Sequence, residues 1–162
     1  MKKIALLTIF MLSLFALSGC SLFAPSEKEF SGSGITITLD DSFAVQETDS
    51  WPLFLSSIDH VFMGLRESKS DAVSVGINTL AEYMDLVLYN GGEENSTVYE
   101  SDNGEYLYAY YTAQVDGEEF GYMLVCMQGA NYYYLMNFGC YSDELDDNKD
   151  QYIAWANTII VE

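Results

Sequence analysis

Two dipeptides that favour tight turns divide the centre of the chain. Asn103-Gly104 and Asp116-Gly117 each suit the type I′ turn of a two-residue hairpin, because both central residues of that turn take positive φ. A third turn is expected around Gly129-Ala130. Together these turns predict an antiparallel meander of four strands over residues 96–140.

The Asp116-Gly117 turn also sets the register of the two strands that it joins. It predicts the cross-strand pairs Ala113 with Phe120, Tyr111 with Tyr122, Ala109 with Leu124, and Leu107 with Cys126. Both faces of this hairpin are then largely apolar or aromatic. A sheet with one face exposed to solvent would show a cleaner alternation of apolar and polar residues. We therefore expect this sheet to be covered on both faces.

Two amphipathic segments can provide that cover. In the first, Thr79 and Glu82 match a capping box, an apolar stripe follows at helical spacing, and Gly91-Gly92 suits the C-terminal end. The second follows an acidic first turn, which complements the helix dipole. Its apolar residues recur at helical offsets near the C-terminus: Leu145, Tyr152, Trp155, Ala156 and Ile159.

The remaining periodic segments are short. Alternation over residues 35–39 predicts a strand, and residues 53–57 and 60–66 predict two more, followed by a charged, exposed turn at 67–71. Residues 158–161 are expected to return to a strand. The predicted fold class is α+β, an antiparallel β-sheet meander flanked by helices on both faces, in a single domain over residues 35–162.

The first residues form a pattern of a different kind. Lys2 and Lys3 precede an apolar run over residues 4–17, which is shorter than the roughly 20 residues that cross a bilayer. A cationic start, a short apolar run and small residues before a cut are typical of a secretory signal peptide, here residues 1–19. Leu17, Ser18, Gly19 and Cys20 resemble the lipobox of bacterial lipoproteins. That resemblance implies a diacylglyceryl group on the Cys20 thiol.

The lipobox predicts where the mature chain is found. Two acyl chains hold a protein stably on a membrane that it does not span, so we expect a lipid anchor on the extracytoplasmic face of the cell membrane. Residues 20–34 mix polar, proline and glycine residues, and they are predicted to be a flexible tether between the lipid and the domain.

The charge of the chain narrows the classes of partner. After Cys20 there are 25 Asp and Glu residues but only four Lys and Arg. Such an acidic surface repels phosphate backbones, which argues against binding nucleic acid. Because of the predicted lipid anchor, the membrane is the first expected partner, and a protein or cell-wall partner is left open.

Few residues suggest chemistry. His60 is the only histidine and has no accompanying nucleophile motif, while Glu93-Glu94 and Glu118-Glu119 are neighbours that point opposite ways in an extended chain. Asp146 to Asp150 resembles a calcium loop, but Gln151 stands where the loop needs glycine. We predict no catalytic residue, no metal site and no cofactor.

Cys126 and Cys140 lie roughly 23 Å out of register at about 3.3 Å per residue, so two buried free thiols are expected.

The sequence is unusually rich in tyrosine. The chain has 13 tyrosines, and Tyr106, Tyr108 and Tyr110 alternate along one predicted strand. Aromatic faces stack on sugars or peptides, which makes these three a candidate binding surface. Tyrosine also has high strand propensity and packs well beneath helices, so core packing is the alternative interpretation.

The order of segments resembles a known family. A lipobox and a short tether are followed by "GITITLDDSF", "TLAEYMDLV", two hairpin turns, "YYYLMNFGC" and "DQYIAWANTIIVE". This succession is similar to that of small bacterial lipoproteins with the PsbP-like fold, over residues 34–162. The resemblance implies an α/β/α sandwich. Its better-known members, an extrinsic photosystem subunit and a nuclear-import cofactor, are accessory proteins without enzymatic activity.

Two functional hypotheses follow. The first is a lipid-anchored extracytoplasmic accessory or binding protein without catalytic activity. The alternative is a small cell-wall or glycan-directed hydrolase whose carboxylates are brought together by the fold.

The lipobox gives a direct prediction. Replacing Cys20 by alanine removes the thiol to which the lipid would be joined, so metabolic palmitate label should vanish from the product and the protein should leave the membrane fraction. Unchanged labelling and fractionation would contradict the anchor.

Overall fold

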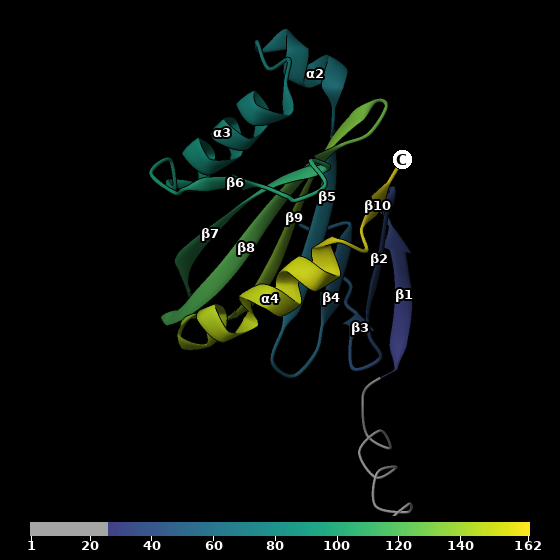
Figure 1. The fold of residues 1–162 in the computed structure, drawn as a ribbon, viewed down its shortest axis with the longest axis vertical. Helices are drawn as coiled ribbons and strands as arrows, with labels where there is room; N and C mark the ends of the chain where they lie inside the picture. The colour runs from purple at the N-terminus through teal and green to yellow at the C-terminus, as the bar shows by residue number, and fades with distance from the viewer. Residues whose placement is uncertain (1–25) are drawn as a thin grey trace, which may run out of the picture.

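The computed structural model describes residues 26–162 as two antiparallel sheets with helices packed against the larger sheet (Figure 1). The strands are β1 (Glu27–Gly32), β2 (Ile35–Asp40), β3 (Ala44–Val45), β4 (Leu53–Ser56), β5 (Val61–Ser68), β6 (Val98–Glu100), β7 (Tyr106–Val115), β8 (Glu118–Gln128), β9 (Tyr132–Tyr141) and β10 (Ile160–Val161). The helices are α2 (Lys69–Ser74), α3 (Leu80–Gly91), the 3-10 turn η1 (Ser142–Glu144) and α4 (Leu145–Ala156). The sheet orders are β1-β2-β10 and β3-β4-β5-β9-β8-β7-β6.

The predicted meander is confirmed, with its register. Strands β6, β7, β8 and β9 are consecutive neighbours, and Tyr111 pairs with Tyr122 as the turn required. Asp116 and Gly117 have φ of 53° and 91°, which identifies the type I′ turn. This turn therefore fixes the register of the longest hairpin.

The Asn103-Gly104 hairpin forms with a different turn, so the type I′ prediction is wrong there. Only Gly104 takes positive φ, at 71°. The Ser101 hydroxyl accepts the backbone N–H groups of Glu105 and Tyr106, both at 3.1 Å, and the Gly104 N–H donates to the Ser101 carbonyl. The serine side chain thus stabilises a longer loop, because it supplies an acceptor that a two-residue turn would not use.

Part of the predicted tether is folded, which corrects its boundary. Residues 27–32 form β1, which pairs with β2 along its whole length. Ser33 and Gly34, with φ of 53° and 72°, form the tight turn that joins β1 to β2. Phe30 is buried in the core. The tether prediction is wrong for residues 27–34, and residues 1–25, including Cys20, lie outside the described residues.

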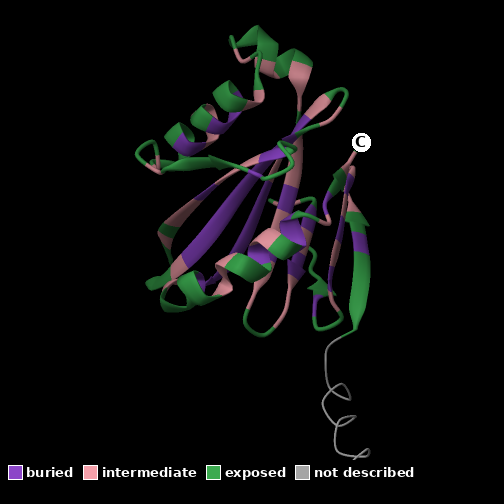
Figure 2. Cartoon of the chain, in the orientation of Figure 1, coloured by how far each residue is buried: buried purple, intermediate pink, exposed green. Residues whose placement is uncertain are grey.

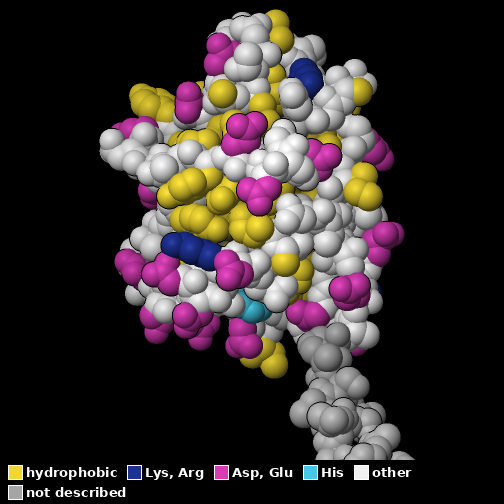
Figure 3. Space-filling view, in the orientation of Figure 1, with side chains coloured by type: hydrophobic (Ala, Val, Ile, Leu, Met, Phe, Trp, Pro, Cys, Tyr) yellow, Lys and Arg dark blue, Asp and Glu magenta, His cyan; other side chains and the backbone are white. Residues whose placement is uncertain are grey.

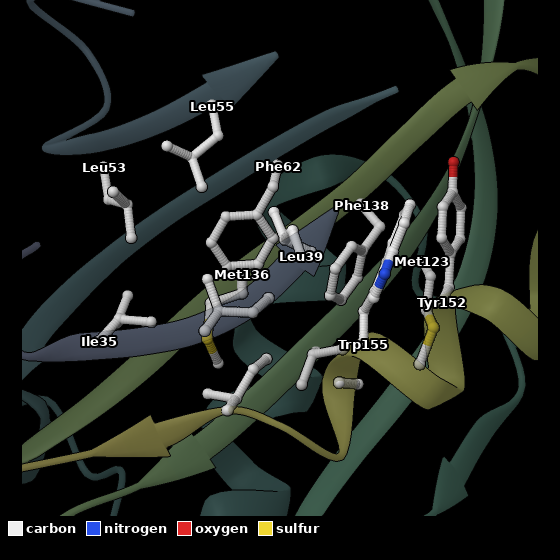
Figure 4. Packing of buried hydrophobic residues seen from close by; sticks show 14 of the residues in the cluster. Ile35, Leu39, Leu53, Leu55, Phe62, Met123, Met136, Phe138, Tyr152 and Trp155 are labelled. Carbon is white, nitrogen blue, oxygen red and sulfur yellow. The ribbon is translucent and has the colours of Figure 1, made fainter. Parts of the chain in front are cut away.

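The core is divided between the two faces of the large sheet (Figure 2). On β8, Met123 and Val125 belong to a first cluster that includes α4 and the three-stranded sheet, whereas Leu124 and Cys126 belong to a second cluster under α3. In the first cluster, Phe138 stacks on Tyr152, with ring centroids 5.3 Å apart (Figure 4). The α+β class is confirmed, and a small sheet shares with α4 the cover of one face.

Both amphipathic helices form where the sequence predicts them. Thr79 and Glu82 make the capping box, and Gly92 ends α3 in the left-handed conformation. The acidic segment from Asp146 to Asp150 lies on α4, so it is a helix start and not a loop. The predicted exposed turn at 67–71 is wrong, because β5 runs on to Ser68 and α2 follows at once.

The two described cysteines are free and buried, as expected. Cys126 faces Leu135 across β8 and β9, whereas Cys140 faces Gly121, and the two thiols lie in different clusters. Burial raises the pKa of both thiols, which keeps them protonated and unreactive at neutral pH. Within residues 26–162, no helix has the length and apolar character that a membrane span needs.

The contact between β8 and α4 gives a stability prediction. A Cβ atom added at Gly121 would lie 2.7 Å from the Cβ of Leu145, the first residue of α4. Gly121→Ala should therefore lower the free energy of unfolding by about 1–3 kcal/mol, measured by urea denaturation. In the control Gly91→Ala the nearest atom is 3.9 Å away, and no loss is expected. Equal stability of both variants would contradict the close packing of α4.

Candidate functional site

Three tyrosines form a partly exposed aromatic surface near the edge of the large sheet, here named the tyrosine face: Tyr99, Tyr108 and Tyr110. Tyr99 and Tyr108 are cross-strand partners on β6 and β7, and their rings stack with centroids 5.3 Å apart. Tyr110 packs edge-on against Tyr108 at 5.7 Å. Tyr99 is 45% exposed, so the surface combines rigid packing with access to solvent.

Tyr106 is not part of this surface, which corrects the predicted set. Its side chain is only 2% exposed, and its hydroxyl donates to the Asn157 Oδ1 at 2.9 Å. Asn157 caps the C-terminal end of α4, so Tyr106 lies where β7 passes beneath that helix. Tyr108 and Tyr110 are half-buried. Tyr99 was not among the predicted residues, because its position beside Tyr108 follows only from the pairing of β6 with β7.

A lysine lies beside the tyrosine face. Lys149 on α4 places its Nζ 4.7 Å from the centre of the Tyr110 ring and 2.5 Å from an Asp146 carboxylate oxygen. Figure 3 shows an apolar area between the positions of β6 and α4, with acidic side chains around it. The surface is therefore aromatic at its centre and mainly anionic at its margin.

One hydroxyl group of this surface has a raised pKa. Burial, followed by the neighbouring Tyr108, raises the pKa of Tyr110 to about 12. Burial also raises the pKa of Tyr106. At neutral pH Tyr110 is therefore a neutral ring with a hydrogen-bonding hydroxyl, which suits recognition of peptides or sugars better than nucleophilic chemistry.

The outer edge of β7 is largely open. In the described part of the chain, β6 pairs only with Leu107, Tyr108 and Ala109, and no strand covers the same edge from Tyr110 to Val115. An exposed strand edge presents unpaired backbone N–H and C=O groups, which an extended segment of a partner can join. The tyrosine face and this edge meet at Tyr110.

His60 has a structural environment. Its Nδ1 lies 3.1 Å from the Tyr152 hydroxyl, and its ring packs against Phe43 and Trp155. Burial lowers the pKa of His60, so the ring is mainly neutral at neutral pH. Its hydrogen-bond partner is a tyrosine whose own pKa is raised by burial, and such a pair is poorly suited to activating a nucleophile.

The acidic side chains that the sequence drew attention to lie at the start of α4, at the start of β8 and just beyond α3. Within residues 26–162, no three His, Cys, Asp or Glu side chains gather as ligands of a metal ion. Two other carboxylates, Glu27 and Asp40, are cross-strand partners at a cleft of about 410 Å³ that Trp155 also lines. Asp40 accepts hydrogen bonds from the backbone and hydroxyl of Ser42, which ties its carboxylate to the turn after β2.

The raised pKa of Tyr110 predicts a pH effect on stability. Between its ordinary pKa near 10 and about 12, the folded chain keeps a proton that the unfolded chain has lost, so the stabilisation present below pH 10 is lost as the pH rises through that window. In urea denaturation, Tyr110→Phe should lose less stability between pH 9 and 11 than the wild type. Tyr89→Phe, at an exposed helix position, is the control. An unchanged slope in Tyr110→Phe would contradict the prediction.

Comparisons with known proteins support the fold. No protein-family model and no curated protein sequence matches the chain. The solution structure of cyanobacterial PsbP (CyanoP) from Synechocystis sp. PCC 6803 is similar with a TM-score of 0.60 at 13% identity, over 90% of this chain and 99% of that one. The Ran-binding protein Mog1p of Saccharomyces cerevisiae has a TM-score of 0.58 at 7% identity, over 85% and 96%.

A third solved structure gives the same result. It comes from Bacteroides thetaiotaomicron VPI-5482 and matches with a TM-score of 0.54 at 10% identity, over 83% of this chain and 48% of that one. At such identities the similarity concerns architecture, since unrelated functions share folds. The chain has the PsbP-like fold.

Proposed function

We propose that this chain is a lipid-anchored accessory protein on the extracytoplasmic face of a bacterial membrane, which binds a protein partner through the tyrosine face. The observation that carries the proposal is the stacked, half-exposed arrangement of Tyr99, Tyr108 and Tyr110 at an open strand edge. Rigid aromatic side chains of this kind dominate binding energy at protein interfaces.

The anchor would hold the domain close to the lipid surface. Because β1 begins at Glu27, the chain from Cys20 to the first strand can extend over at most about 25 Å. A short connection raises the effective concentration of the domain for partners in or on the same membrane. The β6–β7 edge lies across the molecule from β1 in Figure 1, which leaves the tyrosine face away from the attachment point.

Charge favours a basic partner. The described residues include four Lys and Arg side chains, and each lies over an aromatic ring: Lys28, Arg66, Lys69 and Lys149. Against these four cations stand 25 Asp and Glu side chains, so carboxylates dominate the electrostatic surface. A partner with positive charge around an apolar or extended segment would be steered to this face, with association weakened by salt.

Photocrosslinking of the full, anchored chain in its native membrane tests this role. A photoreactive phenylalanine analogue at position 99 should give a discrete protein adduct, since that ring is exposed at the centre of the proposed interface. The same analogue at Tyr89, which is 70% exposed on α3, is the matched control and should give none.

A second variant separates binding from mere proximity. Tyr110→Ala should reduce the adduct from position 99 by about tenfold, because truncating a central aromatic anchor costs an interface more than 1 kcal/mol. Equal adducts from positions 99 and 89, or no effect of Tyr110→Ala, would refute the proposed interface.

The glycan-directed hydrolase remains the second candidate, favoured by one observation. Glu27 and Asp40 are cross-strand partners at the cleft that the largely buried Trp155 also lines. If this candidate is correct, the purified chain should cleave peptidoglycan fragments, and Glu27→Gln should abolish cleavage without loss of stability. Absence of cleavage by the wild-type chain would dismiss the hydrolase.

A further inference from the structure

A small pocket lies on the α3 side of the large sheet, where the helix ends. Its volume is about 140 Å³. Val87 and Leu88 of α3 form one wall, Leu124 and Leu135 of β8 and β9 form another, and Trp51 from the loop before β4 lies at its side. The pocket is therefore lined mainly by apolar side chains, and it belongs to the opposite face of the sheet from Tyr108 and Tyr110.

One buried polar side chain opens into this pocket. Asn137 is only 5% exposed, and its Oδ1 accepts a hydrogen bond from the Tyr111 hydroxyl at 3.1 Å. Within residues 26–162, this is the hydrogen bond that the Asn137 side chain makes. No fully enclosed polar side-chain atom in that range lacks a hydrogen-bond partner. The Asn137 amide nitrogen therefore keeps its donor capacity, on a residue that lines the pocket. Since no enclosed side-chain atom lacks a partner, this nitrogen is reached by solvent, and an occupant that displaces the solvent has to supply an acceptor in its place.

The other polar groups are placed at the rim. Glu93 lies just beyond the C-terminal end of α3 and also lines the pocket. Burial raises the pKa of Tyr111, followed by the effects of Tyr122 and Glu93, so its hydroxyl stays protonated and keeps Asn137 oriented. A hydrogen bond from Tyr111 to the amide oxygen leaves the amide nitrogen as the group available to an incoming molecule.

The volume of the pocket matches that of a single ring. An apolar cavity of about 150 Å³ in another protein holds benzene, which is close to the volume found here. A purely apolar occupant would leave the Asn137 donor without a partner. An occupant with one acceptor oxygen satisfies both the apolar walls and the amide.

We propose that this pocket binds a small phenol-class molecule, a six-membered ring with one hydroxyl. The ring packs against Val87 and Leu124, and the hydroxyl oxygen accepts a hydrogen bond from the Asn137 Nδ2. This site is independent of the tyrosine face and of the proposed partner, so either proposal can fail without the other.

Phenol itself is the probe, titrated into the full chain and followed by the NMR signals of the Asn137 side-chain amide. Saturable shifts at millimolar phenol are expected. Val87→Phe fills the pocket and should weaken phenol binding by about tenfold or more. Val73→Phe is the matched control, because Val73 is 53% exposed on α2, and it should bind as the wild type does. Unmoved amide signals in the wild type, or equal titrations of the two variants, would overturn the proposal.

A ligand comparison decides the matter if Val87→Phe fails to fold. Wild-type chain should bind phenol about threefold to tenfold more tightly than toluene, since one neutral hydrogen bond contributes about 0.5–1.5 kcal/mol. Asn137→Leu keeps the branched shape and the number of heavy atoms of the side chain but removes the donor, and it should lose this preference. Trp51 emission gives a second readout, and Trp51→Phe should remove the phenol-dependent change. Toluene binding as tight as phenol in the wild type would refute the role of Asn137.

Discussion

Strand β8 is buried on both faces over seven consecutive residues, Gly121 to Met127. The rest of the chain therefore has to cover both faces of the large sheet. Each side of the strand exposes apolar surface that has to be removed from water. Helix α3 covers one side, whereas α4 and the three-stranded sheet cover the other. The positions of both helices, and of the surfaces left open between them, follow from this double cover.

Local signals in the sequence were sufficient for most of the architecture. The Asp116-Gly117 turn predicted the register of the central hairpin because both residues readily take positive φ. The capping box of α3 was equally local. What the sequence did not reveal was β1, because only Phe30 of that strand is buried and its remaining residues look like those of a polar linker. Helix α2 was missed for a related reason, since none of its residues is buried.

The candidate site was predictable only in part, because it is assembled across strands. Alternation along β7 selected Tyr108 and Tyr110, but it selected Tyr106 with equal weight. Only the course of β7 beneath the end of α4 separates the buried ring from the exposed ones. Tyr99 needed the register of a three-residue strand. The Asn137 pocket needed the end of α3 to be placed over the sheet, and no linear pattern contains that information.

The pairing of β10 with β2 joins Ile160 to Thr36, two residues that lie far apart in the sequence. Adjacent hairpins close over short loops, whereas this pair has to bring together segments more than 100 residues apart. We expect the meander to assemble first and the small sheet to dock last. Until it does, the underside formed by Met123, Val125 and Phe138 is incompletely shielded. We therefore expect the nascent domain to be most prone to aggregation late in folding. At that stage its strands are already paired, but one side of its core is still in contact with water.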